Sequence, residues 1–159
     1  MFNLLGKKKQ KVALFAPAKG RIMDISDVPD DVFSQKMMGD GIAIDPINDE
    51  IVAPCDGQIV LLAQTKHAIA MRCRGDLELL IHIGLDTVDL GGEGFVSYVG
   101  TGEMVCIGER LIGFDREFLE SQGKSLITAL VITNNDAKVE QIEKNISNTG
   151  GEVMLVTCK

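Results

Sequence analysis

Short apolar runs, each bounded by glycine or by charged residues, recur along the chain and decide its expected fold. They are rich in valine, isoleucine and leucine, and runs of this length and spacing are typical of an antiparallel sandwich or barrel. The runs that carry this prediction are 57–63, 68–73, 77–83, 110–114 and 125–133. The sequence therefore predicts an all-β fold.

Helical signals are few and short. The segment 115–123 has aspartate at a good N-cap position and glycine at its end, which predicts a short helix. The segment 31–39 has room for a turn or two. The segment 136–146 carries three apolar residues at helical spacing, so a further helix is expected there.

One motif occurs twice. The pattern A-P-x-x-G-x-I is present at 16–22 and again at 53–59. In each copy proline separates a turn from the preceding ladder, and glycine supplies the backbone freedom to enter the next strand. Together with a further turn-and-strand unit at 102–112, the repeat favours a duplicated hairpin architecture. The alternative is chance similarity between two turns.

Composition fits a single globular domain, which we expect to span residues 12–159. Hydrophobic residues make up 45% of the 159 residues and charged residues 25%, which excludes a disordered chain. The net charge of −7 argues against a nucleic-acid surface. No apolar run approaches the ~18 residues that a membrane-spanning helix needs.

Residues 1–11 differ from the rest, with Phe2, Leu4 and Leu5 followed by four lysines. The apolar part is too short for a secretory signal, and the lysines follow it instead of preceding it. We expect a flexible basic segment. It would suit weak contact with a membrane surface; the alternative is a solvated tail.

The four cysteines lie far apart and form no C-x-x-C pair. They indicate reduced, buried thiols in a cytoplasmic protein, with disulfides or metal binding as the alternatives. They are Cys55, Cys73, Cys106 and Cys158.

Candidate chemistry rests on the two histidines, His67 and His82, which both fall in strand-like runs. Alternation along 77–83 places the aliphatic residues on one face and His82 on the other, beside Leu80. If 68–73 and 77–83 pair as a hairpin, with 72–76 as the turn, the two imidazoles can lie on one face of adjacent strands. In that arrangement His67 shares its face with Ile69, Met71 and Thr65.

A histidine pair is suited to phosphoryl transfer. The free nitrogen of a neutral imidazole is a nucleophile near neutral pH, and a second imidazole can donate a hydrogen bond to phosphoryl oxygens. Thr65 and the backbone N–H groups of 84–86 are further donors. On pattern alone, two ordinary histidines with satisfied hydrogen bonds remain the alternative.

Three segments together resemble one known family. The run 78–95, E-L-L-I-H-I-G-L-D-T-V-D-L-G-G-E-G-F, is similar to the signature of the glucose-class enzyme IIA domain of the bacterial sugar phosphotransferase system. The segments 53–68 and 27–44 resemble two further segments of that family, the latter through D-V-P-D-D-V-F-S-Q-K-M-M-G-D-G. The similarity extends over nearly the whole chain from about residue 16.

The resemblance implies an antiparallel β-sandwich, described as a duplicated barrel-sandwich hybrid, and a phosphocarrier without a cofactor. His82 would accept a phosphoryl group from the carrier protein HPr and pass it to a cysteine of the IIB domain of a membrane sugar permease. His67 and Thr65 would assist the transfer. The backbone carbonyl of Gly84 would hold the second nitrogen of His82.

The resemblance also implies a docking depression around His82, with four apolar side chains as lining and two acids on its rim. The acids would suit a basic partner through electrostatic steering. The lining residues are Val32, Phe33, Met38 and Leu80, and the rim residues are Asp30 and Asp86. Ordinary core packing is the alternative for Phe33 and Met38.

Three other functions are alternatives. A biotinyl or lipoyl carrier needs a modifiable lysine in a setting such as M-K-M, which Lys66 does not have. A zinc enzyme needs at least three protein ligands, so zinc at His67 and His82 would have to be shared with a partner's carboxylate. A regulatory module, in which phosphorylation toggles binding to other proteins, would add to the carrier role.

Overall fold

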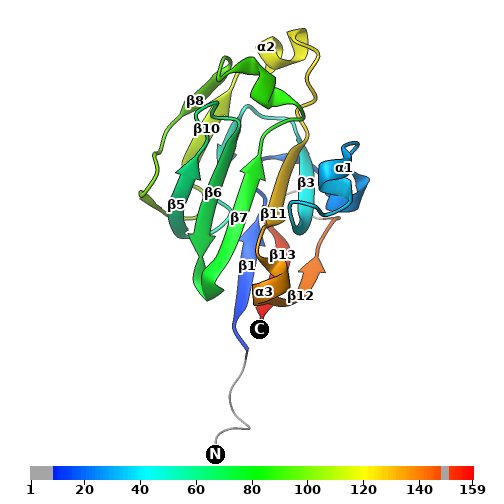
Figure 1. Ribbon diagram of the computed structural model, residues 1–159, viewed down its shortest axis with the longest axis vertical. Coiled ribbons are helices and arrows are strands. Elements are labelled where there is room, and N and C mark those ends of the chain that lie inside the picture. The colour runs from blue at the N-terminus through cyan, green and yellow to red at the C-terminus, as the bar shows by residue number, and fades with distance from the viewer. Residues whose placement is uncertain (1–8, 148–150) are drawn as a thin grey trace, which may run out of the picture.

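The computed structural model describes residues 9–147 and 151–159, which fold into three antiparallel sheets (Figure 1). The largest has seven strands in the order β2-β3-β11-β7-β6-β5-β9, and the two smaller ones have the orders β1-β13-β12 and β4-β10-β8. The strands are β1 Lys11–Phe15, β2 Gly20–Asp24, β3 Asp40–Pro46, β4 Glu50–Val52, β5 Gly57–Leu62, β6 Ala68–Cys73, β7 Leu77–His82, β8 Phe95–Ser97, β9 Met104–Val105, β10 Arg110–Phe114, β11 Thr128–Ile132, β12 Val139–Lys144 and β13 Glu152–Cys158.

The predicted all-β sandwich is confirmed, although the sheets of the described residues stay open and do not close into a barrel. The strands expected at 57–63, 68–73, 77–83, 110–114 and 125–133 correspond to β5, β6, β7, β10 and β11. The expected hairpin is also present. β6 pairs with β7 from Ala68 opposite His82 to Cys73 opposite Leu77, and the turn is a short 3-10 segment, η3, at Arg74–Asp76.

The repeated motif is a structural repeat. The residue before each copy donates its backbone N–H to the proline carbonyl of the other copy: Phe15 bonds Pro54 at 2.9 Å, and Val52 bonds Pro17 at 2.8 Å. Each copy then leads through its glycine into a strand, β2 or β5. This reciprocal exchange supports the duplicated architecture over chance similarity between two turns.

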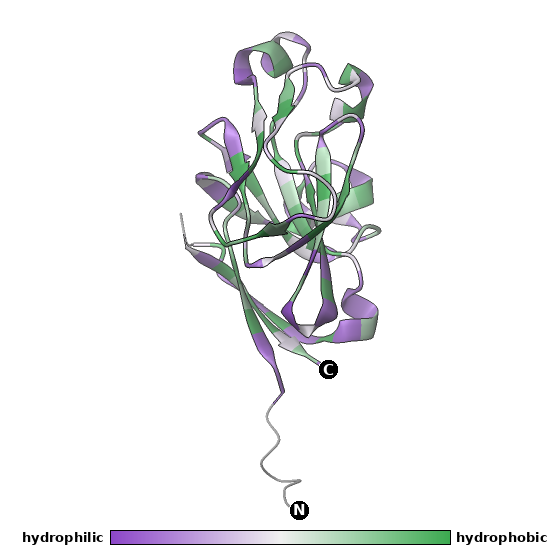
Figure 2. Ribbon diagram, turned by 90° about the vertical axis from the view of Figure 1, so that its left-hand side faces the viewer, coloured by the Kyte–Doolittle hydropathy of each residue, from purple (hydrophilic) through white to green (hydrophobic). Residues whose placement is uncertain are grey.

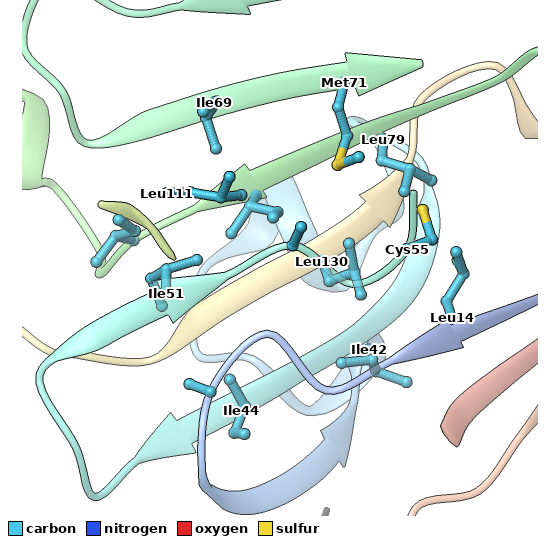
Figure 3. Packing of buried hydrophobic residues seen from close by; sticks show 14 of the residues in the cluster. Leu14, Ile42, Ile44, Ile51, Cys55, Ile69, Met71, Leu79, Leu111 and Leu130 are labelled. Atoms are coloured by element: carbon cyan, nitrogen blue, oxygen red, sulfur yellow. The ribbon is translucent and has the colours of Figure 1, made fainter. Parts of the chain in front are cut away.

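The core lies between the sheets. On β7 and just beyond it, Leu77, Leu79, Ile81 and Ile83 are fully buried, as their alternation predicts. Figure 3 shows Leu79 beside Met71 of β6, and Ile69 and Leu14 belong to the same buried cluster. Hydrophobic segments follow the strands, and the connecting turns are more polar (Figure 2). The buried face of β7 therefore fixes which face His82 takes.

The helices are short: α1 Asp31–Ser34, α2 Arg116–Ser121 and α3 Asn135–Lys138, with further 3-10 segments η2 Ile25–Asp27 and η4 Thr87–Leu90. α1 and α2 confirm the predictions for 31–39 and 115–123. The side chain of Asp30 caps α1 by accepting a bond from the Val32 N–H. That of Asp115 caps α2 by accepting from the Phe118 N–H.

The helix predicted over 136–146 is wrong. Only α3 is helical, and Val139–Lys144 forms β12, which pairs with β13. The register of this pair shifts between Val139 and Gln141, as at a β-bulge. Because a bulge adds a residue to one strand, Val139 and Ile142 pack on the core at a spacing of three, which imitates a helix.

Lys11 is the first residue of β1, and Lys9 forms an ion pair with Glu140 of β12. The membrane contact expected of residues 1–11 depends on Phe2, Leu4 and Leu5, which lie outside the described residues. Among the residues that the structure describes, no helix is both long enough and apolar enough to span a membrane.

Replacement of Gly41 by alanine is expected to destabilise the fold strongly. A Cβ atom at Gly41 of β3 would lie 2.0 Å from the Leu130 carbonyl oxygen of β11, and backbone cannot move aside as a side chain can. We expect Gly41→Ala to lower the free energy of unfolding by about 3 kcal/mol, measured by urea denaturation. The control is Gly100→Ala, whose nearest neighbour is a side-chain oxygen of Glu103 at 3.4 Å. Equal stability of the two variants would contradict this.

Candidate active site

His82 lies at the end of β7, in the middle of the large sheet. Its cross-strand neighbours are Ala68 of β6 and Ala129 of β11. Two alanines beside the imidazole leave room for it above the sheet. The half-buried ring thus rises from a rigid strand whose other face is locked into the core.

One nitrogen of His82 is engaged by the turn that follows β7. The His82 Nδ1 atom lies 2.9 Å from the carbonyl oxygen of Gly84, so Nδ1–H donates to it. This leaves Nε2 with its lone pair free. Gly84 has a φ of 73°, and a Cβ there would lie 2.7 Å from the carbonyl oxygen of Ser125. Only glycine therefore fits this turn without a shift, and the Gly84 contact that the family resemblance implies is present.

Thr87 braces the same turn, and the sequence reasoning did not single it out. It is fully buried in η4, and its hydroxyl donates to the carbonyl oxygen of Ile83. A threonine that directly follows Gly-Leu-Asp after a strand is suited to such a side-chain-to-backbone bond, which is the signal that was available. Thr87 thus stabilises the turn whose Gly84 carbonyl binds His82.

His67 comes to His82 from the segment before β6. The two ring centroids lie 4.9 Å apart and the rings are inclined by 82°. The Nδ1 atom of His67 lies 2.5 Å from the Thr65 hydroxyl oxygen, and its backbone carbonyl accepts from the Ile83 N–H at 2.7 Å. The three residues Thr65, His67 and His82 therefore form one cluster.

The sequence-based explanation of why His67 and His82 lie close together is wrong in part. His67 was expected to share a face with Ile69 and Met71, but both of those side chains are buried in the core beneath the sheet. His67 lies outside β6, in a turn where Lys66 has a φ of 57°. This left-handed residue breaks the alternation and allows the His67 ring to reach His82.

The environment keeps both imidazoles neutral. Burial lowers the pKa of His82 below its usual 6.5, and the Gly84 carbonyl and the charges of Asp30 and Asp86 partly oppose this. Burial, followed by repulsion from His82, lowers the pKa of His67. At pH 7 the Nε2 lone pair of His82 is therefore available for attack.

The pKa directions predict the pH behaviour of both rings. We expect each imidazole of the folded protein to titrate below pH 6.5, followed by NMR of the ring C–H signals. The unfolded chain holds these protons more tightly, so the free energy of unfolding should fall as the pH drops from 6.5 through the folded-state pKa values. A midpoint above 6.5 for either ring would contradict this.

The predicted docking residues fall into two groups. Val32 and Met38 are partly exposed, at 42% and 38%, and Leu80 is half-buried. Phe33 is only 4% exposed, and its ring meets His82 edge-on at a centroid distance of 5.0 Å. Phe33 therefore lies beneath the surface and supports the imidazole, in a second buried cluster that α1 and η2 close.

Two exposed apolar side chains next to these segments were not predicted: Met37 and Val88, which are 71% and 51% exposed. Met37 adjoins Met38, and Val88 lies in η4, the turn that follows Asp86. The sequence of a turn does not show how exposed its side chains are, so Met37 and Val88 could not be identified from it.

Within residues 9–147 and 151–159 there is no group of three or more histidine, cysteine or acidic side chains placed to hold a metal ion. Zinc shared between His67, His82 and a partner's carboxylate stays a prediction.

The fold and the site together define a class of protein: an antiparallel β-sandwich that carries a pair of neutral histidines on the face of its large sheet. The chain belongs to the family described as phosphoenolpyruvate-dependent sugar phosphotransferase system, EIIA 1, whose model matches residues 12–138.

Individual relatives agree with this assignment. The chain is 46% identical over 159 residues to the PTS system glucose-specific EIIA component of Bacillus anthracis, covering 98% of this chain and 96% of that protein. It is 47% identical over 132 residues to the component of the same name from Staphylococcus aureus strain N315, covering 82% and 80%. Among solved structures, glucose permease IIA from Mycoplasma capricolum superposes with a TM-score of 0.77 at 33% identity, covering 94% of this chain and 95% of that one.

Proposed function

We propose that this protein is the phosphocarrier of a glucose-class sugar phosphotransferase system, and that it acts in the cytoplasm. It accepts a phosphoryl group from phospho-HPr on His82 and donates it to a cysteine of a permease IIB domain. The observation that carries the proposal is the bond from His82 Nδ1–H to the Gly84 carbonyl, because it leaves Nε2 as the free nucleophile. Family membership and the names of the relatives support the assignment.

In the first step Nε2 of His82 attacks phosphorus in line with the N–P bond of phospho-HPr. The new N–P bond forms as the old one breaks, and the leaving imidazole of HPr recovers the lone pair. No general base is needed at His82, because its Nε2 carries no proton. Phosphoryl transfer then depends mainly on positioning and on donors aimed at the oxygens.

His67 supplies such a donor. If the Thr65 hydroxyl donates to His67 Nδ1 across their 2.5 Å contact, the proton of His67 resides on Nε2, the nitrogen that is free to bond a phosphoryl oxygen. The ring lies 4.9 Å from that of His82, close enough for the oxygens of a phosphoryl group on His82. Thr65 is therefore a positioning residue, which sets the tautomer of His67.

In the second step a thiolate of the IIB domain attacks the same phosphorus. The P–S bond forms and the P–N bond to His82 breaks, so Nε2 regains its lone pair. The bond to Gly84 is retained throughout, because Nδ1–H is not involved. The carrier thus returns to its starting state without gaining or losing a proton.

Docking of both partners is proposed on the surface around His82. Val32 and Met38 contribute apolar area there, and Met37 and Val88 extend it. Asp30 and Asp86 lie close enough to influence the charge on His82, and as acids beside the nucleophile they favour a basic partner. A modest face of this kind suits short-lived complexes.

The test is a chase experiment with the full chain. Protein labelled by enzyme I, HPr and radioactive phosphoenolpyruvate is purified and mixed with membranes that contain a glucose-class permease. We expect the label to move to glucose, and only when the permease is present. Stable label on the protein in the presence of permease and glucose would contradict the donor role. Failure to acquire label would contradict the proposal as a whole.

A further inference from the structure

Cys55 and Cys73 form a thiol pair that the chemistry at His82 does not use. Cys55 lies in the turn that leads into β5, and Cys73 is the last residue of β6. Both residues line one cavity, each influences the pKa of the other, and they are only 7% and 9% exposed. Figure 3 shows the Cys55 sulfur near Leu79, on the core side of the sheet.

This pair is remote from the histidines. Cys73 lies opposite Leu77, at the turn end of the β6–β7 hairpin, whereas Ala68 at the other end lies opposite His82. Five residue steps separate the two ends, which corresponds to about 17 Å along a strand. Cys73 also follows Ile69 and Met71 on the core face. Chemistry at the thiols is therefore separate from chemistry at His82.

Both cysteines line a cavity that has room for small molecules. A cavity of about 210 Å³ is lined by Cys55 and Cys73 together with Asp56 and Arg74. A second hollow, of about 350 Å³, reaches Cys73 between Arg72 and Arg74. A water molecule occupies about 30 Å³, so hydrogen peroxide, which is only slightly larger, has room beside the pair.

The two thiols are not equivalent. The hydrogen bond from Cys55 lowers the pKa of Cys73, and the same interaction, followed by burial, raises the pKa of Cys55. Thiolate character favours attack on an oxidant. Cys73 is thus suited to react first, with Cys55 in place to react with the product.

We propose that Cys55 and Cys73 are a site of reversible oxidative modification, at which hydrogen peroxide converts the two thiols that line this cavity into a disulfide. The Cys73 sulfur attacks one peroxide oxygen, the O–O bond breaks, and the departing hydroxide leaves as water with the Cys73 proton. The Cys55 sulfur then attacks the resulting sulfenic acid. The S–S bond forms, the S–O bond breaks, and a second water leaves with the Cys55 proton. Two thiols are oxidised and one peroxide is reduced to two waters.

Closing the bond needs only a local shift. The two sulfurs, which belong to residues lining the same cavity, must come within about 2.05 Å of each other. Both cysteines lie next to turns: Cys55 lies in the second A-P-x-x-G motif, and Cys73 ends β6 just before Gly75 and Asp76, which have positive φ. The remaining partners of the sheet stay in place.

The other two cysteines provide internal comparisons. Cys158 lies behind the same turn, where a Cβ at Gly75 would come within 2.6 Å of its sulfur, so it is the competing partner for Cys73. Cys106 is exposed, contrary to the expectation that all four thiols are buried. Because it is exposed, it is the thiol that small reagents reach directly.

The experiment maps thiols in the full-length protein. Reduced protein is freed of reductant, treated with hydrogen peroxide, denatured and alkylated, and its peptides are analysed by mass spectrometry without reduction. We expect a peptide pair linked through Cys55 and Cys73, two hydrogens lighter than the free peptides and cleaved by dithiothreitol. In Cys106→Ala the same link should form. In Cys55→Ala it should be absent, with Cys73 carried on to the sulfinic acid.

Two outcomes would overturn the proposal. In the first, peroxide oxidises Cys106 of the wild type and leaves Cys55 and Cys73 alkylated. In the second, Cys73 is linked to Cys158 instead. Neither outcome depends on whether a variant folds, because both are read in the wild-type chain, and neither bears on the role of His82.

Discussion

Replacing His82 by alanine should abolish labelling by enzyme I, HPr and radioactive phosphoenolpyruvate. His82 provides the only lone pair placed by the Gly84 bond for attack, and its loss removes the nucleophile itself. Loss of a nucleophile lowers a rate by roughly 10⁴-fold or more. The label should therefore fall below detection on the timescale on which the wild type is fully labelled.

The matched control is His67→Ala, which removes the other imidazole of the same cluster. It should still take up label that is labile in acid and stable in alkali, as expected for phosphohistidine. Circular dichroism and thermal unfolding of both variants separate loss of the nucleophile from loss of the fold. Labelled His82→Ala, or an unlabelled but fully folded His67→Ala, would contradict the roles assigned here.

The second large effect is expected for His67→Gln, in the step that donates the phosphoryl group. Glutamine keeps a polar side chain but does not reproduce the ring that lies 4.9 Å from His82 and contacts Thr65. The glutamine amide can donate a hydrogen bond, but it is not held in the position of the ring, and loss of a well-placed donor to a developing negative charge costs about 10²–10³-fold in rate. We expect His67→Gln to become phosphorylated by phospho-HPr and to lose its phosphoryl group to the IIB domain that much more slowly than the wild type.

Single-turnover measurement distinguishes the two steps. Phosphorylated wild type and His67→Gln are mixed separately with IIB domain, and the decay of phosphoprotein is followed by quenched flow. Thr65→Val is the companion variant, because it keeps His67 but removes the hydroxyl that sets its tautomer. It should fall between the two. Equal donation rates for wild type and His67→Gln would remove His67 from the mechanism.

Much of the fold was predictable because the buried strands alternate without interruption. Leu77 to Ile83 has a single aliphatic face, so both the strand and the orientation of His82 follow from its sequence. The prediction for 136–146 was wrong because a bulge between Val139 and Gln141 changes the spacing of core residues. A register shift of this kind depends on the partner strand, β13, and leaves no local signature.

The sequence named residues that the structure brings together, but it did not give their geometry. Alternation alone would have turned His67 toward the core with Ile69, and it is the left-handed Lys66 that brings the ring to His82 instead. A positive φ at a lysine is rare and cannot be expected from its sequence position. Phe33 likewise belongs to the predicted site, yet its burial beneath His82 depends on how α1 packs.

The repeat shows the opposite case, in which a weak sequence signal had a clear structural meaning. From the sequence alone, chance similarity remains an alternative explanation of the two A-P-x-x-G-x-I copies. The bonds between Phe15 and Pro54 and between Val52 and Pro17 tie each copy to the other. The two halves therefore support one another at the place where each enters its strand.

The most direct measurement is NMR of the wild-type protein labelled with ¹⁵N at its histidines, before and after phosphorylation by enzyme I, HPr and phosphoenolpyruvate. The account predicts phosphorus coupling to Nε2 of His82, with Nδ1 still protonated and bonded to Gly84 in both states. Phosphorus on Nδ1 of His82, phosphorus on His67, or no phosphohistidine at all would contradict it.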